Sequence, residues 1–352
     1  MANPGRIKTV ASEGGIVPEN FPDYGSIYTT DVQLPYRQAP YPLVEFEDPQ
    51  LKGFQAILIA DTADNSDGRL ATMITRFPRR VLAEMNTHRV FGRNSASSRA
   101  RTLKMVIKSV MDDPFIPRFT KNTKGMSGRF VTVAEQAEAE KYWLRGRDRA
   151  VDTVMELLMG ARYDGSAPIG PQLDEYYEAY RSGDTTGMLS VHKQDANRVL
   201  EPYIWHEAII TSAYWKNFFD LRTDLSAADP SIYAIALLME AALKGSTPVD
   251  SKIHLPFVSE ADMLTGDEPL ELARPTLMLA STESAQISYK DKASAAKSTA
   301  TTALGERLLS MKHMSPFEHV AYRTDAPAVA DLTGDLSGNL SPDWVQLRRI
   351  YE

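Results

Sequence analysis

The stretch THRVFGRNSASSR, from Thr87 to Arg99, holds the most informative residues of the sequence. It lies between Arg76 and Leu103, a segment with seven arginines and one acidic residue, Glu84, in a 352-residue chain whose net charge is −7. An Arg guanidinium matches phosphate oxygens with two parallel donors, and serines and small residues suit a loop around an anion. We interpret the segment as a site for a small anionic ligand; the alternative is a solvated basic face.

The composition excludes several classes of protein. The chain has no cysteine, which excludes a disulfide framework, a thiolate metal site and a cysteine nucleophile. Its 43% of apolar and 24% of charged residues are typical of a soluble globular protein. Because the net charge is negative and no stretch approaches the ~18 apolar residues of a membrane span, we expect no nucleic-acid partner and no membrane partner. We expect a cytoplasmic protein, in the host cytoplasm if a phage encodes it.

The pattern of apolar residues predicts a mixed α/β fold with more helix than strand. Residues 55–60, QAILIA, are typical of a buried strand. From Leu70 the pattern favours helix, which Gly92 would end. We predict further helices at residues 135–159, 195–221, 232–243 and 293–312, a short strand at 320–322, and a connection at 161–190.

Two parts of the chain differ in composition. Residues 1–50 are predicted to form an irregular arm, because seven prolines interrupt any periodic pattern. For residues 51–352 we predict a single catalytic domain. Within it, residues 51–265 and residues 266–352 carry different sequence motifs.

The common cofactor and metal signatures are missing. The sequence contains no G-x-G-x-x-G fingerprint, no P-loop and no G-x-S-x-G elbow. His206 and Glu207 begin like a zinc motif, but Ile210 stands where the second histidine would be, and the six histidines lack metal-ligand spacing. We therefore expect no metal site.

Five segments of the chain together resemble the flavin-dependent thymidylate synthases, the ThyX family. His88 and Arg89, followed by Ser97 after seven residues, resemble the R-H-R-x7-S signature of the family. The other segments resemble A-R-x-x-L-P at residues 197–202, N-F-x-x-L-R at 217–222, A-A-R-V-S-[FY] at 284–289 and H-x-[ST]-P-F-E-H at 313–319.

The order of these segments is unusual. In the family, the A-A-R-V-S and P-F-E-H segments precede R-H-R, whereas here they follow it by about 200 residues. The order indicates a circular permutation, as in a phage-like branch of the family, which is tolerated where the original termini lie close together at the surface. We therefore expect the segments around Ser288 and His313–His319 to lie beside the segment around His88–Arg99.

The resemblance implies a fold, a reaction and an assembly. The fold would be a mixed, mainly antiparallel sheet flanked by long helices, in a homotetramer. The enzyme would transfer a one-carbon unit from methylenetetrahydrofolate to C5 of dUMP, giving dTMP, with FAD carrying hydride and NADPH reducing the flavin. The absence of cysteine agrees with this choice, because the unrelated thymidylate synthases need a thiolate to attack C6 of the pyrimidine.

The resemblance also implies roles for individual residues. Arg222 would lie at the pyrimidine edge and stabilise negative charge there, and His313 would lie on the folate and nicotinamide side; both are the catalytic candidates. The residues implied to bind the nucleotide are Glu84, Ser97, Ser98, Arg99, Arg198 and Arg222. Those implied to bind the cofactor are Thr87, His88, Arg89, Asn94, Ser95, Thr211, Asn217, Ser288, Ser315 and Glu318.

For several of these residues, a structural role is the alternative to ligand binding or catalysis. Arg198 could pair with Glu201 or Asp195 within its own helix. Arg222 could compensate the dipole at a helix C-terminus, and His313 could cap one. Trp215 and Phe218 share a face with Arg222, where we expect core packing rather than a flavin contact.

Four positions depart from the family pattern and leave the substrate open. Thr87 stands in place of the first Arg of R-H-R, Ser95 in place of a Glu, Glu84 in place of a Gln, and Gln286 in place of the Arg of A-A-R-V-S. Glu84 and Ser95 keep open a hydroxymethylase that acts on dUMP or dCMP. Thr87 and Gln286 keep open a non-catalytic flavin- or nucleotide-binding scaffold.

Overall fold

The structure is a computed structural model that forms two compact units. It describes residues 27–30, 43–48, 51, 53–63, 68–96, 101–123, 129–258, 263–285, 298–332, 338–340 and 342–352. The first unit comprises Met1–Phe77, Ala83–Ala96 and Glu207–Glu352, and the second comprises Pro78–Leu82 and Ser97–His206. The sequence-based boundary at residue 265 falls within the first unit, and a single domain over residues 51–352 stays a prediction. No helix of the described residues has both the length and the apolarity needed to cross a bilayer.

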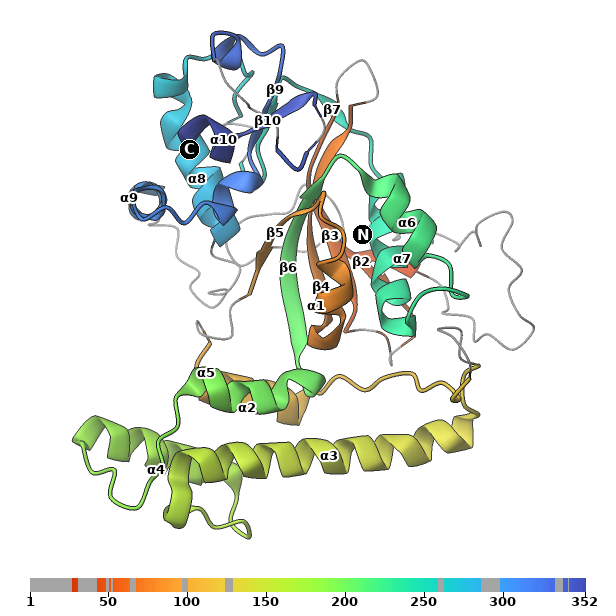
Figure 1. Ribbon diagram of the computed structural model, residues 1–352, viewed down its shortest axis with the longest axis vertical. Helices are drawn as coiled ribbons and strands as arrows, with labels where there is room; N and C mark the ends of the chain where they lie inside the picture. The colour runs from red at the N-terminus through yellow and green to blue at the C-terminus, as the bar shows by residue number, and fades with distance from the viewer. Residues whose placement is uncertain are drawn as a thin grey trace. The chain divides into compact units, whose positions relative to one another are not determined.

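A seven-stranded sheet forms the centre of the first unit within the described residues (Figure 1). Its strand order is β1-β2-β3-β4-β6-β5, with β7 beside β3. The β1–β2, β2–β3, β3–β4 and β5–β6 pairs are antiparallel, and the β3–β7 pair is parallel. The strands are β1 (Ile27–Thr30), β2 (Leu43–Phe46), β3 (Gln55–Ala63), β4 (Leu70–Pro78), β5 (Gly92–Ser95), β6 (Trp205–Ser212) and β7 (Val249–Asp250).

A three-stranded antiparallel sheet, in the order β10-β9-β8, and several helices complete the first unit. Helix α7 packs against β2 and β3, and α8 packs against α9. The remaining elements are α1 (Leu82–Met85), α6 (Trp215–Arg222), α7 (Pro230–Lys244), β8 (Ile253–His254), α8 (Leu270–Ala285), α9 (Ser298–Ser310), η7 (Ser315–Glu318), β9 (Ala321–Arg323), η8 (Pro327–Val329), β10 (Trp344–Gln346) and α10 (Leu347–Tyr351). The predicted mixed α/β class, with antiparallel sheets flanked by helices, is confirmed.

Three sequence-based assignments of secondary structure in the first unit were wrong. The segment from Leu70 is strand β4 rather than helix, and residues 205–212 of the predicted helix 195–221 are strand β6. Both strands are buried along nearly their whole length, and a strand buried on both faces lacks the alternation that distinguishes strand from helix in a sequence. Within the predicted irregular arm, the described segments 27–30 and 43–46 are strands that pair with each other.

The second unit is helical and has its own core. Its 27-residue helix α3 (Val133–Met159) confirms the helix predicted at 135–159, and it begins with a capping box in which Thr132 and Glu135 bond each other's backbone N–H. Part of the predicted connection at 161–190 is helix α4. The other helices are η2 (Arg79–Val81), α2 (Leu103–Asp112), η3 (Gly160–Arg162), α4 (Ile169–Ser182), α5 (Lys193–Ala196) and η4 (Asn197–Tyr203).

A chain of buried hydrogen bonds joins the two sheets of the first unit. His254 of β8 contacts the Thr62 hydroxyl through Nδ1 at 2.8 Å and the Thr72 hydroxyl through Nε2 at 2.7 Å. The Thr72 hydroxyl lies 2.6 Å from that of Thr211, which lies 2.8 Å from Nδ1 of His319. All five side chains are buried. Burial lowers the pKa of both His254 and His319 to about 3, so both imidazoles are neutral at pH 7.

An ion pair between half-buried Arg69 and buried Asp61 attaches the β3–β4 hairpin to helix α7. The Arg69 guanidinium binds both carboxylate oxygens of Asp61, at 2.8 and 2.6 Å, and donates to the carbonyl of Leu243 at 2.7 Å. The Asp61 side chain is fully buried, and it also accepts a hydrogen bond from the Ser246 hydroxyl. One guanidinium therefore neutralises a buried carboxylate and satisfies a carbonyl at the end of α7.

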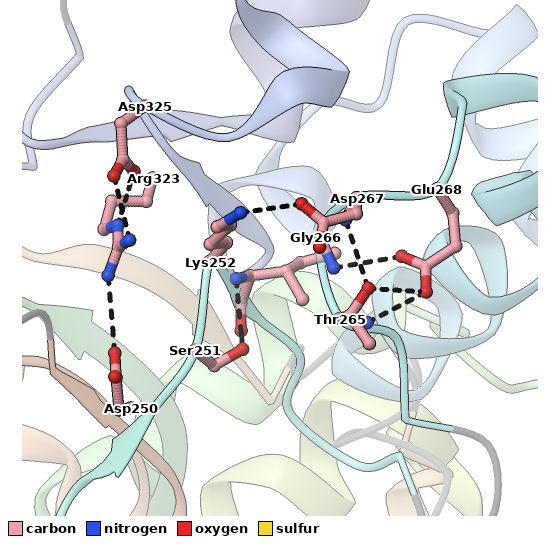
Figure 2. Close-up of polar contacts among 10 residues, drawn as sticks. Asp250, Ser251, Lys252, Thr265, Gly266, Asp267, Glu268, Arg323 and Asp325 are labelled. Carbon is pink, nitrogen blue, oxygen red and sulfur yellow. Dashed lines mark hydrogen bonds and ion pairs between the residues drawn. The ribbon is translucent and has the colours of Figure 1, made fainter.

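Polar contacts fix the turn at residues 265–268, just before α8 (Figure 2). The carboxylate of Glu268 accepts from the N–H and hydroxyl of Thr265 and from the N–H of Gly266, at 2.9 to 3.0 Å. Burial acts to raise the pKa of Glu268, but these hydrogen bonds outweigh it and lower the pKa. Gly266 has a φ of +88°, and a Cβ there would lie 2.7 Å from the Lys252 side chain, so this turn requires glycine.

We expect Arg69→Met to lower the free energy of unfolding by about 3–5 kcal/mol, because it leaves the buried Asp61 carboxylate unpaired. Urea denaturation at pH 7 measures the change. The control is Lys244→Met, which removes an exposed ion pair with Glu240 and should cost less than about 1 kcal/mol. A loss below about 1 kcal/mol for Arg69→Met would contradict this account.

We also expect the protein to lose stability as the pH falls below 6.5. In that range the unfolded chain binds protons at His254 and His319, whereas the folded chain, with pKa values of about 3, does not. Each histidine then lowers the free energy of unfolding by up to about 1.4 kcal/mol per pH unit. Urea denaturation at pH 7, 6 and 5 measures the slope, and equal stability at pH 7 and 5 would refute the neutral, buried state of these residues.

Candidate functional site

The first feature of the site is a guanidinium held in one orientation. Arg222, in the last turn of α6, donates from Nε to Nε2 of His88 at 3.0 Å and from Nη2 to the hydroxyl of Thr87 at 3.2 Å. The Thr87 hydroxyl in turn donates to the carbonyl of Glu84 at 2.7 Å. Four residues that the sequence analysis assigned to cofactor and nucleotide therefore form one hydrogen-bonded group.

Aromatic packing fixes the imidazole that holds Arg222. The His88 ring meets Phe218 edge-on at 4.9 Å between centroids and stacks on Phe91 at 5.6 Å. Phe91 also contacts Trp215 and Phe218, each at 5.1 Å. Trp215 and Phe218 are buried, which confirms the prediction that they form core.

The imidazole of His88 is neutral at pH 7. Its pKa is lowered to about 4, chiefly by burial and also by the positive charges of Arg222 and Arg93. Since Nε2 accepts from Arg222, the proton of the neutral ring is on Nδ1. A neutral acceptor orients Arg222 without cancelling its charge, so the guanidinium keeps a full positive charge for a ligand.

Two segments that are distant in sequence lie side by side at strand β5. The Asn94 amide donates to the carbonyl of Ser284 at 2.7 Å across 190 residues. A Cβ on Gly92 would lie 3.3 Å from the carbonyl oxygen of Glu318, and η7 packs against β5. The predicted adjacency of these segments is therefore confirmed for their described parts. That they form a flavin site stays a prediction.

A second arginine holds the turn that carries Thr87 and His88. Arg93 of β5 donates to the carbonyls of Met85 and His88, at 3.2 and 3.4 Å. Burial lowers the pKa of Arg93, while the nearby carboxylate of Glu318 acts in the opposite direction. The side chain of Arg93 thus packs the turn onto the sheet.

The carboxylate of Glu318 has a partner that sequence analysis did not find. Arg348 of α10 pairs with it, and the amide of Gln346 donates to its backbone carbonyl at 3.0 Å. Both residues lie about 30 positions further along the chain and outside every matched segment. No local pattern marks them, because their contact with Glu318 arises only from the packing of α10 and β10 onto η7.

Other candidate residues lie at the surface of the first unit. The side chains of Arg89, Asn217, His313 and Ser315 are exposed, and Ser95 is half-buried on β5. His313 follows Lys312, which has a φ of +58°, and its N–H bonds the carbonyl of Leu308 at 2.9 Å. These features form a Schellman turn that ends α9, so the backbone of His313 caps that helix while the imidazole stays available.

Two of the candidate residues, Thr211 and Arg198, contact other side chains of the protein. Thr211 is fully buried, and its hydroxyl belongs to the chain of hydrogen bonds between the sheets. Arg198 lies in the second unit, where it approaches Glu201 at 3.7 Å, as the structural alternative expected. A ligand role for either residue stays a prediction.

Four candidates lie outside the described residues: Ser97, Ser98, Arg99 and Ser288. Their roles rest on the sequence alone. The described residues contain no group of three or more metal-ligating side chains.

Comparisons with known proteins give only distant similarity. No protein-family model matches the chain, and no curated protein matches it. Among solved structures, it is similar to the UMP/dUMP methylase PolB from Streptomyces cacaoi bound with 5-Br UMP, with 14% identity and a TM-score of 0.37 over 55% of this chain and 89% of that one. For PolB bound with 5-Br dUMP, the identity is 15% and the TM-score 0.32, over 50% and 66% of the two chains.

We expect Arg222→Leu to raise the pKa of His88 from about 4 toward 6.5, because it removes the nearest positive charge. Titration of the imidazole by NMR measures the change. Arg89→Leu is the control, since Arg89 adjoins His88 in sequence but is exposed and does not contribute to its pKa. An unchanged pKa in Arg222→Leu would contradict the geometry described here.

Proposed function

We propose that the protein is a flavin-dependent enzyme that transfers a one-carbon unit from methylenetetrahydrofolate to C5 of a pyrimidine deoxynucleoside monophosphate. The reaction that the sequence resemblance implies is dUMP to dTMP, with FAD as cofactor, NADPH as reductant and a homotetramer as the assembly. The observation that carries the proposal is the guanidinium of Arg222, which neutral His88 and Thr87 hold in one orientation.

Arg222 provides a fixed positive charge for the edge of the base. His88 and Thr87 engage its Nε–H and one hydrogen of Nη2, which leaves both hydrogens of Nη1 and one of Nη2 for a ligand. As C5 becomes nucleophilic, negative charge grows on N3 and O2 of the pyrimidine ring. A guanidinium that is already oriented stabilises this charge without reorganising during the reaction.

The donors next to Arg222 and His88 in sequence fit a flavin dinucleotide. Arg89 is exposed and forms no ion pair within the described part of the chain, and Asn217 presents an exposed amide one turn and a half before Arg222 on α6. These two side chains would hold the pyrophosphate and a polar edge of FAD. Bound there, FAD would supply the hydride chemistry that no side chain provides.

Glu84 favours a second candidate substrate, dCMP. One oxygen of its carboxylate is buried and accepts no hydrogen bond within the described residues. A one-carbon transfer to C5 of dCMP uses the same fixed charge at Arg222, and the two substrates differ in the exocyclic group at C4 and in whether N3 carries a hydrogen.

Mass spectrometry of dUMP and dCMP after incubation with the protein, FAD, NADPH and methylenetetrahydrofolate tests the proposal. A one-carbon gain on either nucleotide supports it: a methyl group on dUMP for the family reaction, or a gain on dCMP for the second candidate. No gain on either nucleotide, with FAD bound, would leave the non-catalytic binding protein as the better account.

We expect Arg222→Ala to lower kcat by about 10²–10³-fold and to weaken nucleotide binding much less, because the charge it stabilises develops mainly in the transition state. Steady-state kinetics and equilibrium binding separate the two effects. Lys216→Ala is the control, since Lys216 is exposed on the same helix and pairs with Asp220. Equal losses in kcat and affinity would contradict the role of Arg222.

A further inference from the structure

One carboxylate oxygen of Glu84 is buried and accepts no hydrogen bond from the described residues. Glu84 lies in α1, one turn before Thr87 and His88, and its backbone carbonyl accepts from both the N–H and the hydroxyl of Thr87. In contrast to this carbonyl, the carboxylate oxygen Oε2 has no hydrogen-bond donor among the described residues, although it is buried. Glu84 also forms no ion pair within the described part of the chain. A buried carboxylate oxygen without a partner is costly, so a ligand that brings a donor is the simplest reason for it.

The position of Glu84 relates it to the site of Arg222. The Thr87 hydroxyl bridges the two residues, through hydrogen bonds of 2.7 Å to the Glu84 carbonyl and 3.2 Å from Arg222. Despite this, the Glu84 carboxylate does not pair with the guanidinium. The turn from Glu84 to His88 and the end of α6 therefore carry two groups of opposite kind that do not pair with each other, a donor-only guanidinium and an acceptor-only carboxylate.

This pair of groups matches one pyrimidine better than the other. The pairing edge of cytosine presents two adjacent acceptors, O2 and N3, and then a donor, the 4-amino group. A guanidinium supplies adjacent donors for the first two, and a carboxylate accepts from the third. Uracil places an N–H donor at N3 and an acceptor at O4, so it would direct an N–H at the guanidinium and a carbonyl lone pair at the carboxylate.

We infer that Glu84 selects the base, and that it selects cytosine: its carboxylate accepts a hydrogen bond from the 4-amino group of dCMP while Arg222 donates to N3 and O2. This inference rests on the proposed function, because it takes a pyrimidine monophosphate as the ligand of this site. It makes Glu84 a specificity-determining residue rather than a catalytic one.

Calorimetric titration of the purified protein with dCMP and with dUMP, without folate or reductant, tests the inference. We expect dCMP to bind about ten- to a hundredfold more tightly than dUMP. Glu84→Gln should reduce this ratio at least tenfold, since an amide offers O4 of uracil a donor. Asp220→Asn is the matched control: it makes the same change of charge on an exposed residue two positions from Arg222 and should leave the ratio unchanged.

A third nucleotide, tested on the unaltered protein, keeps the inference testable if Glu84→Gln does not fold. The 2-pyrimidinone deoxyribonucleoside monophosphate lacks any group at C4, and we expect it to bind the unaltered protein at least tenfold more weakly than dCMP. Tighter binding of dUMP, or equal losses for dCMP and dUMP in Glu84→Gln, would overturn the inference and leave the proposed function standing. Failure of both nucleotides to bind would instead overturn the proposed function.

Discussion

The first unit depends on the neutrality of two buried histidines. Thr62, Thr72 and Thr211 come from three strands of the large sheet, and their hydroxyls meet His254 of the small sheet and His319 after η7. The Thr72 and Thr211 hydroxyls each have two partners in this chain, so each can donate to one and accept from the other, and a neutral imidazole supplies both an N–H and an acceptor nitrogen. A charged imidazole would lose an acceptor and leave a buried charge, so packing of the two sheets requires both rings to be neutral.

The same chain of hydrogen bonds places the elements of the candidate site. Thr211 is the register partner of Gly92 on β5, and His319 directly follows Glu318, whose carbonyl lies against Gly92. The bond between Thr211 and His319 therefore holds η7 against the strand that follows the His88 turn. Because Gly92 has no side chain, the backbone of Glu318 approaches closely there, and two segments about 200 residues apart in sequence become neighbours.

Two carboxylates of the first unit, those of Asp61 and Glu84, differ in whether the folded chain satisfies them. Asp61 is fully buried, yet Arg69 and Ser246 satisfy its carboxylate. Arg222 and Glu84 lie on connected turns, and each retains capacity for a ligand: hydrogens on the guanidinium and a buried oxygen on the carboxylate. Groups left in this state lower the stability of the ligand-free protein, and they are typical of binding sites.

The sequence alone determined the kind of fold, the long helix that ends at Met159 and the residues around Arg222. These features depend on local pattern: helical periodicity in one case, and in the other short segments that resemble a known family. It could not identify β4 or β6, since a strand buried on both faces shows no alternation. It also gave no sign of the contacts of Glu318 with Arg348, or of Asn94 with Ser284, because nothing near these residues in the chain specifies a partner so far away. Only the tertiary structure decided that His88 is neutral, that the Thr211 hydroxyl bonds both Thr72 and His319, and that one oxygen of the Glu84 carboxylate has no donor among the described residues, since burial and neighbours from distant segments set the charge and the hydrogen bonds of each.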